Sequence, residues 1–295
     1  WFHRLVWRLV FKPKKRDLSL FNGSPCSISV KASKANKVIH VVNLINPDLL
    51  QNKDLANRVG ITLQSIRLAQ RNNTTLLGVI TDDFDATVAG FSNHNWKFKK
   101  INRNATSVGS KIKFAFLRDM LIAALDLASD GDVIFYSNMD CPVHPKVYQN
   151  LLGENFDTVE YIRKDIPCPK DYSDIFSLPF EHYDIGVDGL AFKKESLIEF
   201  LKLFPDFIIG EPHWDTAASG ILHKNFNVAQ NLSDLYHIKH PQQWDDNNLT
   251  EAGKYNKKLY KDCINYGLMY DKLISIKRDC VILLNTEDAE VSHLI

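Results

Sequence analysis

The chain is poor in glycine, has scattered cysteines and lacks any long apolar run, and each shortage excludes a class of protein. Its 295 residues include only 13 glycines. Neither G-x-x-x-x-G-K-[ST] nor a G-x-G-x-x-G after an expected strand occurs, which argues against nucleoside-triphosphatase loops and dinucleotide oxidoreductases. The five cysteines form no C-x-x-C pair, so we expect no zinc ribbon or disulfide framework, and a reducing compartment is favoured. No run of about 18 apolar residues occurs, so no transmembrane helix is predicted.

Positive and negative charges nearly balance over the whole chain, but basic side chains are concentrated in its first 16 residues. The net charge is +1, which argues against a nucleic-acid-binding protein. Residues 1–16 nevertheless carry six basic side chains and no acidic one, interleaved with Trp1, Trp7 and other apolar residues. Such a basic amphipathic segment, taken as residues 1–18, suits the surface of an anionic membrane. The alternative is a helix that packs on its own domain or on a partner protein.

Residues 37–295 alternate between two kinds of hydrophobic pattern. Short apolar runs rich in β-branched residues predict strands at 38–47, 75–81, 133–138, 159–166 and 189–194, and helical spacing predicts helices at 54–71, 111–129, 196–204 and 255–270. The tail ends with a further apolar run at 280–284. Alternating strands and helices are typical of an α/β domain with a mostly parallel, Rossmann-type sheet flanked by helices.

Ligands of such sheets bind beyond the carboxyl ends of the strands. Polar residues follow three expected strands, namely Asn43, Asn46, Asp82, Asp83, Asn138 and Asp140. Strand alternation would place Asn138 and Asp140 on one side, where their oxygens can hold Mg²⁺ or Mn²⁺. A cation there can bridge the phosphates of a nucleoside diphosphate and neutralise the charge of the leaving group. The alternative is that Asp140 only caps the following turn.

The segment Asn138-Met139-Asp140 resembles the metal-binding D-x-D region of GT-A-fold glycosyltransferases, which use nucleotide sugars; the resemblance extends over residues 37–245. It departs from the pattern at Asn138, where the family has an acid. The resemblance implies that Asn43, Asn46, Asp82 and Asp83 lie near the nucleotide. It also implies that Arg118, with Lys111, brings positive charge to the donor.

Two later segments resemble the acceptor side of the same family. Residues 208–222 contain Glu211, His213, Trp214 and Asp215. Trp214 can stack on a sugar, and Asp215, with Glu211 as second choice, can deprotonate an acceptor hydroxyl; Asp215 can equally cap a helix.

The resemblance extends further, to a strand-helix unit and to a pair of histidines. A second unit opens with Asp188, which is expected to bind substrate. In this family a histidine after the acceptor region completes the metal's coordination, which implies His237 or His240 as a ligand. Imidazole suits Mn²⁺ better than Mg²⁺.

Together these features predict a metal-assisted hexosyltransferase that moves a sugar from a nucleoside diphosphate to a hydroxyl of a glycan or lipid-linked glycan. The resemblance implies bacterial surface-polysaccharide assembly, such as lipopolysaccharide, and a cytoplasmic protein peripheral to the inner face of the membrane. Whether the sugar's configuration is inverted or retained stays open. Two alternatives stay open as well: a sugar nucleotidyltransferase, and a catalytically silent domain that binds glycans or a partner.

Overall fold

The computed structural model describes residues 36–44, 53–81, 96–153, 156–240, 248–269 and 281–283, with only the backbone described at 182–186 and 281–283. The basic segment 1–18 and the residues Asn46, Asp82 and Asp83 lie outside the described residues, so the predictions made for them stay predictions. None of the helices in the described ranges is long and apolar enough to span a bilayer.

Within the described residues, nine strands form a mixed sheet at the centre of the fold, in the order β3-β2-β1-β4-β6-β5-β7-β9, with β8 paired to β5. The strands are β1 (Val38–Leu44), β2 (Thr74–Ile80), β3 (Trp96–Lys100), β4 (Val133–Ser137), β5 (Thr158–Ile166), β6 (Glu181–Lys193), β7 (Val228–Asn231), β8 (Tyr236–Ile238) and β9 (Val281–Leu283). Only β6 runs against its neighbours β4 and β5; the other pairings are parallel. The expected α/β architecture with a mostly parallel sheet is therefore confirmed.

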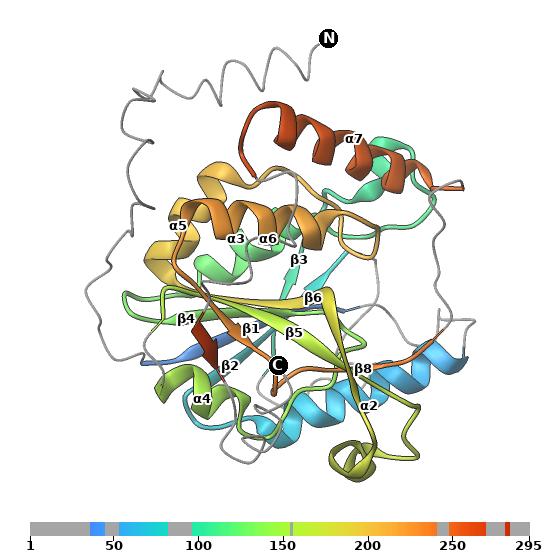
Figure 1. Ribbon diagram of the computed structural model, residues 1–295, viewed down its shortest axis with the longest axis vertical. Helices are drawn as coiled ribbons and strands as arrows, with labels where there is room; N and C mark the ends of the chain where they lie inside the picture. Colours follow the sequence, from blue (N-terminus) through green and yellow to red (C-terminus); the bar gives the residue numbers. More distant parts are fainter. Residues whose placement is uncertain are drawn as a thin grey trace.

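Helices cover both faces of this sheet (Figure 1). The helices are α2 (Lys53–Ala69), α3 (Leu117–Leu125), α4 (Val147–Gly153), α5 (Lys194–Leu203), α6 (Trp214–Asn225) and α7 (Glu251–Asn265), with 3₁₀ turns at Ala105–Val108 and Tyr172–Ser177. Helices α3, α5 and α6 lie on one face, with α7 beyond them, and α2 and α4 lie on the other. Alternate residues of β1 supply both cores: Ile39 and Val41 face one, Val38 and Val42 the other. Burial on both faces explains the almost continuous apolar run that identified this strand.

The helix expected over 111–129 is wrong in its first third. Ala115 and Phe116 form isolated β-bridges to Asn104 and Ile208, and α3 begins only at Leu117. Long-range backbone pairing therefore overrides the helical spacing of this stretch, because tertiary contacts outweigh intrinsic propensity.

Candidate active site at the carboxyl edge of the sheet

The fold has its topological switch point between β1 and β4. From β1 the chain adds β2 and β3 on one side and then returns to pair β4 with the other side of β1. In open α/β sheets the ligand crevice lies outside the carboxyl ends of the strands at such a point. Asn43 lies near the end of β1, and Asn138 and Asp140 directly follow β4. The predicted location of the site therefore coincides with the switch point.

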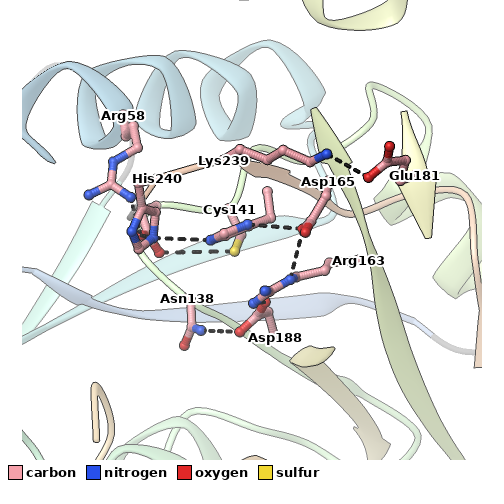
Figure 2. Close-up of polar contacts among 11 residues, drawn as sticks. Arg58, Asn138, Cys141, Arg163, Asp165, Glu181, Asp188, Lys239 and His240 are labelled. Atoms are coloured by element: carbon pink, nitrogen blue, oxygen red, sulfur yellow. Dashed lines mark hydrogen bonds and ion pairs between the residues drawn. The ribbon is translucent and has the colours of Figure 1, made fainter. Parts of the chain in front are cut away.

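Three of the predicted metal ligands converge at this edge. One ligand atom from each of Asp140, His237 and His240 can be chosen so that all three lie within 4.8 Å of one another. Nε2 of His240 is 3.8 Å from Oδ2 of Asp140 and 3.2 Å from Nε2 of His237 (Figure 2). One carboxylate and two imidazoles form a mixed oxygen and nitrogen donor set that suits Mn²⁺, Zn²⁺ or Fe²⁺ better than Mg²⁺. The residues fit a divalent cation, and three ligands leave coordination positions open for substrate; their role as ligands stays a prediction.

A second layer of polar contacts orients one of these imidazoles. The Nδ1 atom of His237 lies 3.0 Å from Oδ1 of Asp165, because β8 pairs parallel with β5 and sets the two residues opposite each other. Arg163 lies 2.9 Å from the same carboxylate through Nε and 2.6 Å from Oδ2 of Asp188 through Nη1. A carboxylate that accepts from Nδ1 of a histidine directs its Nε2 outward, as around protein-bound zinc. Asp165 therefore presents Nε2 of His237 to the cluster.

Asn138 does not join Asp140 in the way that strand alternation predicts. Strand β4 ends at Ser137, and the chain turns at Met139 and Asp140. The amide of Asn138 is instead held by two hydrogen bonds of 2.6 Å: its Oδ1 accepts from the Tyr136 hydroxyl, and its Nδ2 donates to Oδ1 of Asp188. The expectation that both oxygens share one cation is thus not supported by the described contacts.

Asp188 occupies an irregularity of the sheet. Tyr161 of β5 pairs with Gly189 and Ile162 pairs with Val187, so Asp188 is the extra residue of a β-bulge. Bulges re-aim side chains and recur next to active sites. Here the carboxylate of Asp188 contacts Asn138 and Arg163, and its role in substrate binding stays a prediction.

Asp215, in the first turn of α6, has the properties of a general base. Burial, together with the charge of nearby Asp188, raises its pKa to about 6 despite hydrogen bonds from Thr216 that lower it. A carboxylate with a pKa near 6 is largely ionised at neutral pH and is a better proton acceptor than an ordinary aspartate.

Trp214, next to Asp215 in the chain, is not exposed as a sugar contact would have to be, and the role expected of His213 stays a prediction. Trp214 is only 4% exposed, and its ring lies edge-on to Tyr136 with centroids 5.6 Å apart, inside the core. His213 has a left-handed backbone (φ 78°) before the helix, and its ring stacks on Tyr260. A sugar cannot stack on a ring that is almost completely buried, so the structure does not support the stacking predicted for Trp214.

Glu211, the second choice for the base, lies in the loop before α6 and contacts the N-terminus of α7. It is buried and accepts a hydrogen bond of 2.6 Å from the hydroxyl of Thr250, the residue that caps this helix. Burial raises the pKa of Glu211 while this hydrogen bond lowers it. The contacts described for Glu211 are structural, and none of them reaches the Asp140 cluster.

The two residues expected to bring positive charge lie on the α3 side of the fold. Arg118 donates hydrogen bonds to the carbonyls of Leu201 and Phe204 at the end of α5, and its Nε lies 3.7 Å from Asp206. Carbonyls at a helix C-terminus attract cations, which accounts for this placement. Lys111 is exposed in the irregular segment before α3. Neither described position supports the expected donor contact.

Asn43 remains a candidate for a ligand-binding residue. It is buried near the carboxyl end of β1, and its Oδ1 has no hydrogen-bond partner in the described structure. A buried acceptor without a partner costs free energy. A donor group of a ligand at the switch point would satisfy it.

Three charged residues of the site were not predicted from the sequence, namely Arg58, Arg163 and Asp165. Two of them alternate along the strand predicted at 159–166, and Arg58 lies beside the apolar residues of the helix predicted at 54–71. A charged residue on an otherwise apolar face must find a partner. A charged residue among apolar ones therefore indicates a buried ion pair, but the sequence does not show which residue is its partner.

Comparisons with known proteins bear on the arrangement of the chain alone. No protein-family model matches it, and no curated protein matches it. Among solved structures, a proposed nucleotide-diphospho-sugar transferase from Desulfovibrio desulfuricans G20 is 11% identical over 77% of this chain and 98% of its own, with a TM-score of 0.45.

Two further solved structures show the same level of likeness. A mannosyltransferase from Pyrobaculum calidifontis, in complex with GDP-mannose and Mn²⁺, is 10% identical over 77% of this chain and 63% of its own, with a TM-score of 0.43. The 4-diphosphocytidyl-2C-methyl-D-erythritol synthase from Anaerococcus prevotii is 12% identical over 77% and 99%, with a TM-score of 0.42. Similarity this distant leaves the reaction to be argued from the residues of the site.

Proposed function

We propose that this chain is a glycosyltransferase that moves a sugar from a nucleoside-diphosphate donor to a hydroxyl of a glycan or lipid-linked glycan, with a divalent cation held by Asp140, His237 and His240. The observation that carries the proposal is the convergence of these three ligands at the carboxyl edge of the sheet. The raised pKa of Asp215 supports it. The donor set favours Mn²⁺ over Mg²⁺. When bound, the cation supplies charge neutralisation at the diphosphate.

The residues of the chain divide the reaction between them. The bond from the sugar's anomeric carbon to the diphosphate oxygen breaks, the nucleoside diphosphate leaves with the electron pair, and the acceptor oxygen forms the new bond. In an inverting reaction Asp215 takes the acceptor's proton. In a retaining reaction Asp215 is a sugar contact and the leaving diphosphate takes the proton. Asp188, fixed by Asn138 and Arg163, is placed to accept a hydrogen bond from a sugar hydroxyl.

The cellular setting is part of the proposal. A basic segment with tryptophans would hold the enzyme at an anionic membrane surface, where a lipid-linked acceptor is available. We therefore place the protein at the cytoplasmic face of the membrane, in the assembly of a surface polysaccharide.

The proposal is tested by binding first and turnover second. The purified chain is titrated with Mn²⁺, Zn²⁺ and Mg²⁺, and thermal unfolding is then followed with UDP-, GDP-, dTDP- and CMP-sugars with and without the preferred cation. Metal-dependent stabilisation by one nucleotide class is expected, followed by release of the nucleoside diphosphate when an acceptor is added. Asp140→Ala should abolish both effects, and Asp130→Ala, at a side chain 92% exposed, should abolish neither.

The same assays separate the alternatives. Release of pyrophosphate from a nucleoside triphosphate and a sugar phosphate would identify a nucleotidyltransferase. A response to oligosaccharides alone, without any effect of cations or nucleotides, would identify a binding domain and refute the enzyme. Normal turnover by Asp140→Ala would remove the cation from the reaction.

A further inference from the structure

A buried arginine lies against the carboxylate of the cation cluster, and the reaction described above gives it no role. Arg58 of α2 has a side chain only 3% exposed, and its Nη1 lies 3.4 Å from Oδ2 of Asp140 (Figure 2). Its Nε is buried and has no hydrogen-bond partner in the described structure. Arg58 belongs to α2, which lies on the face of the sheet opposite α3, α5 and α6 (Figure 1).

The charges of Asp140 and Arg58 disfavour binding of a cation that is not accompanied by an anion. Imidazoles bind metals in the neutral form, so the negative charge of Asp140 is balanced by Arg58 before any ion enters. A divalent cation on Asp140 would then share one carboxylate with a guanidinium that cannot lose its proton. Two positive groups held close together in a partly buried site repel each other strongly. Added anionic charge would remove this repulsion.

A diphosphate is the ligand that fits this excess of charge. The bridging diphosphate of a nucleotide sugar carries two negative charges, which match the two charges that the cation adds. A guanidinium presents a planar fork of N–H donors that suits phosphate oxygens. The unpartnered Nε of Arg58 is one such donor.

We infer that Arg58 binds the diphosphate of the donor and couples it to the cation: the free protein binds the cation weakly, and the diphosphate strengthens cation binding. This inference rests on the proposed function for the identity of the donor. Coupling of this kind is reciprocal, so the cation strengthens diphosphate binding by the same factor.

The test compares the whole chain with Arg58→Met, which removes the charge and keeps the bulk, and with Arg58→Lys, which keeps the charge without the fork. Mn²⁺ affinity is measured by calorimetry without nucleotide, and UDP, GDP and inorganic pyrophosphate are then titrated at a fixed free Mn²⁺ concentration. Arg58→Met should bind Mn²⁺ alone more tightly than the wild type, on the order of 5-fold, and the diphosphate probes more weakly by at least as much. Arg58→Lys should restore the weak Mn²⁺ binding and only part of the diphosphate affinity.

The opposite changes expected in the Mn²⁺ affinity and the diphosphate affinity of Arg58→Met distinguish diphosphate binding by Arg58 from a structural role. If Arg58 merely supported Asp140, Arg58→Met would weaken Mn²⁺ binding, and that result overturns the inference. Equal diphosphate affinity in the wild type and in Arg58→Met overturns it as well, while leaving the proposed function intact. If the wild type binds none of the three probes with Mn²⁺ present, both the inference and the proposed function are wrong.

Discussion

Replacing Asp215 with Asn is expected to stop the reaction and, at the same time, to stabilise the fold at neutral pH. Asn keeps the size and the acceptor oxygen for Thr216 but cannot take a proton. It also removes a negative charge that is buried beside Asp188, the two causes that raise the pKa of Asp215 to about 6. Active-site groups held against their preferred ionisation are a common source of such a trade between stability and function.

The sign and size of the change in the free energy of unfolding follow from the pKa of Asp215. The folded value of about 6 lies above the model value of 3.8, so the fold favours the protonated acid. The stability that Asp215 contributes is fully present below about pH 4 and is lost as the pH rises through about 6. A difference of about two pKa units corresponds to roughly 3 kcal/mol, an upper limit because the residue keeps some exposed surface. Asp215→Asn should recover up to this amount above pH 7.

Thermal unfolding of the wild type and the variant at pH 7.5 and pH 4 checks the reasoning. The variant should unfold at a higher temperature at pH 7.5, and the two proteins should converge at pH 4, where both side chains are neutral. Asp130→Asn, which removes an exposed acid paired with Lys194, is the control and should gain nothing. A variant that is less stable at pH 7.5 would refute the buried-charge argument, and unchanged turnover would remove Asp215 from the mechanism.

Three further changes have expected outcomes. Asp165→Ala frees the His237 imidazole and should weaken Mn²⁺ binding by roughly 10- to 100-fold in calorimetry. It also removes a partner of Arg163, so the apo-protein should lose stability as well; equal Mn²⁺ affinity would show that the imidazole needs no orienting partner. Thr250→Ala removes the α7 cap and the partner of buried Glu211, and should cost about 1–3 kcal/mol in urea unfolding, whereas Thr250→Ser should cost little. Deleting residues 1–16 should abolish sedimentation with anionic vesicles but not nucleotide binding; persistent vesicle binding would place membrane contact elsewhere.

Most of the fold could be predicted because its elements carry their own pattern. Strand β1 is apolar on both faces, and α2 repeats its apolar residues at helical spacing, so each could be recognised from a short window. The antiparallel placement of β6 could not, because a strand's direction depends on which neighbours it pairs with. The first third of the helix expected at 111–129 failed for the same reason: Ala115 and Phe116 pair with distant segments.

The candidate site likewise contains residues that could be predicted from the sequence and residues that could not. Asp140 could be proposed because it follows a predicted strand, where ligands bind, and His237 and His240 could be proposed from the resemblance to GT-A-fold glycosyltransferases. Arg58 and Asp165 could not, because their partners lie 82 and 72 residues away. Buried charges show in the sequence that a partner exists, but only the packing of α2 and the pairing of β8 with β5 identify it.

The packing around Asn138 gives a physical reason for the residue that departs from the D-x-D pattern. Its Nδ2 donates to Oδ1 of Asp188 at 2.6 Å, and an aspartate there would set two carboxylate oxygens at that distance, so that one must hold a proton. Asn138→Asp restores the pattern in the sequence. We nevertheless expect it to destabilise the fold by about 1–3 kcal/mol at pH 7.5, less at pH 5, and not to tighten Mn²⁺ binding. Asn231→Asp is the matched control, because Asn231 donates to Asp234 at 2.8 Å in the same way; it should lose stability similarly. A variant Asn138→Asp that keeps its stability and binds Mn²⁺ more tightly would show that residue 138 faces the cation after all.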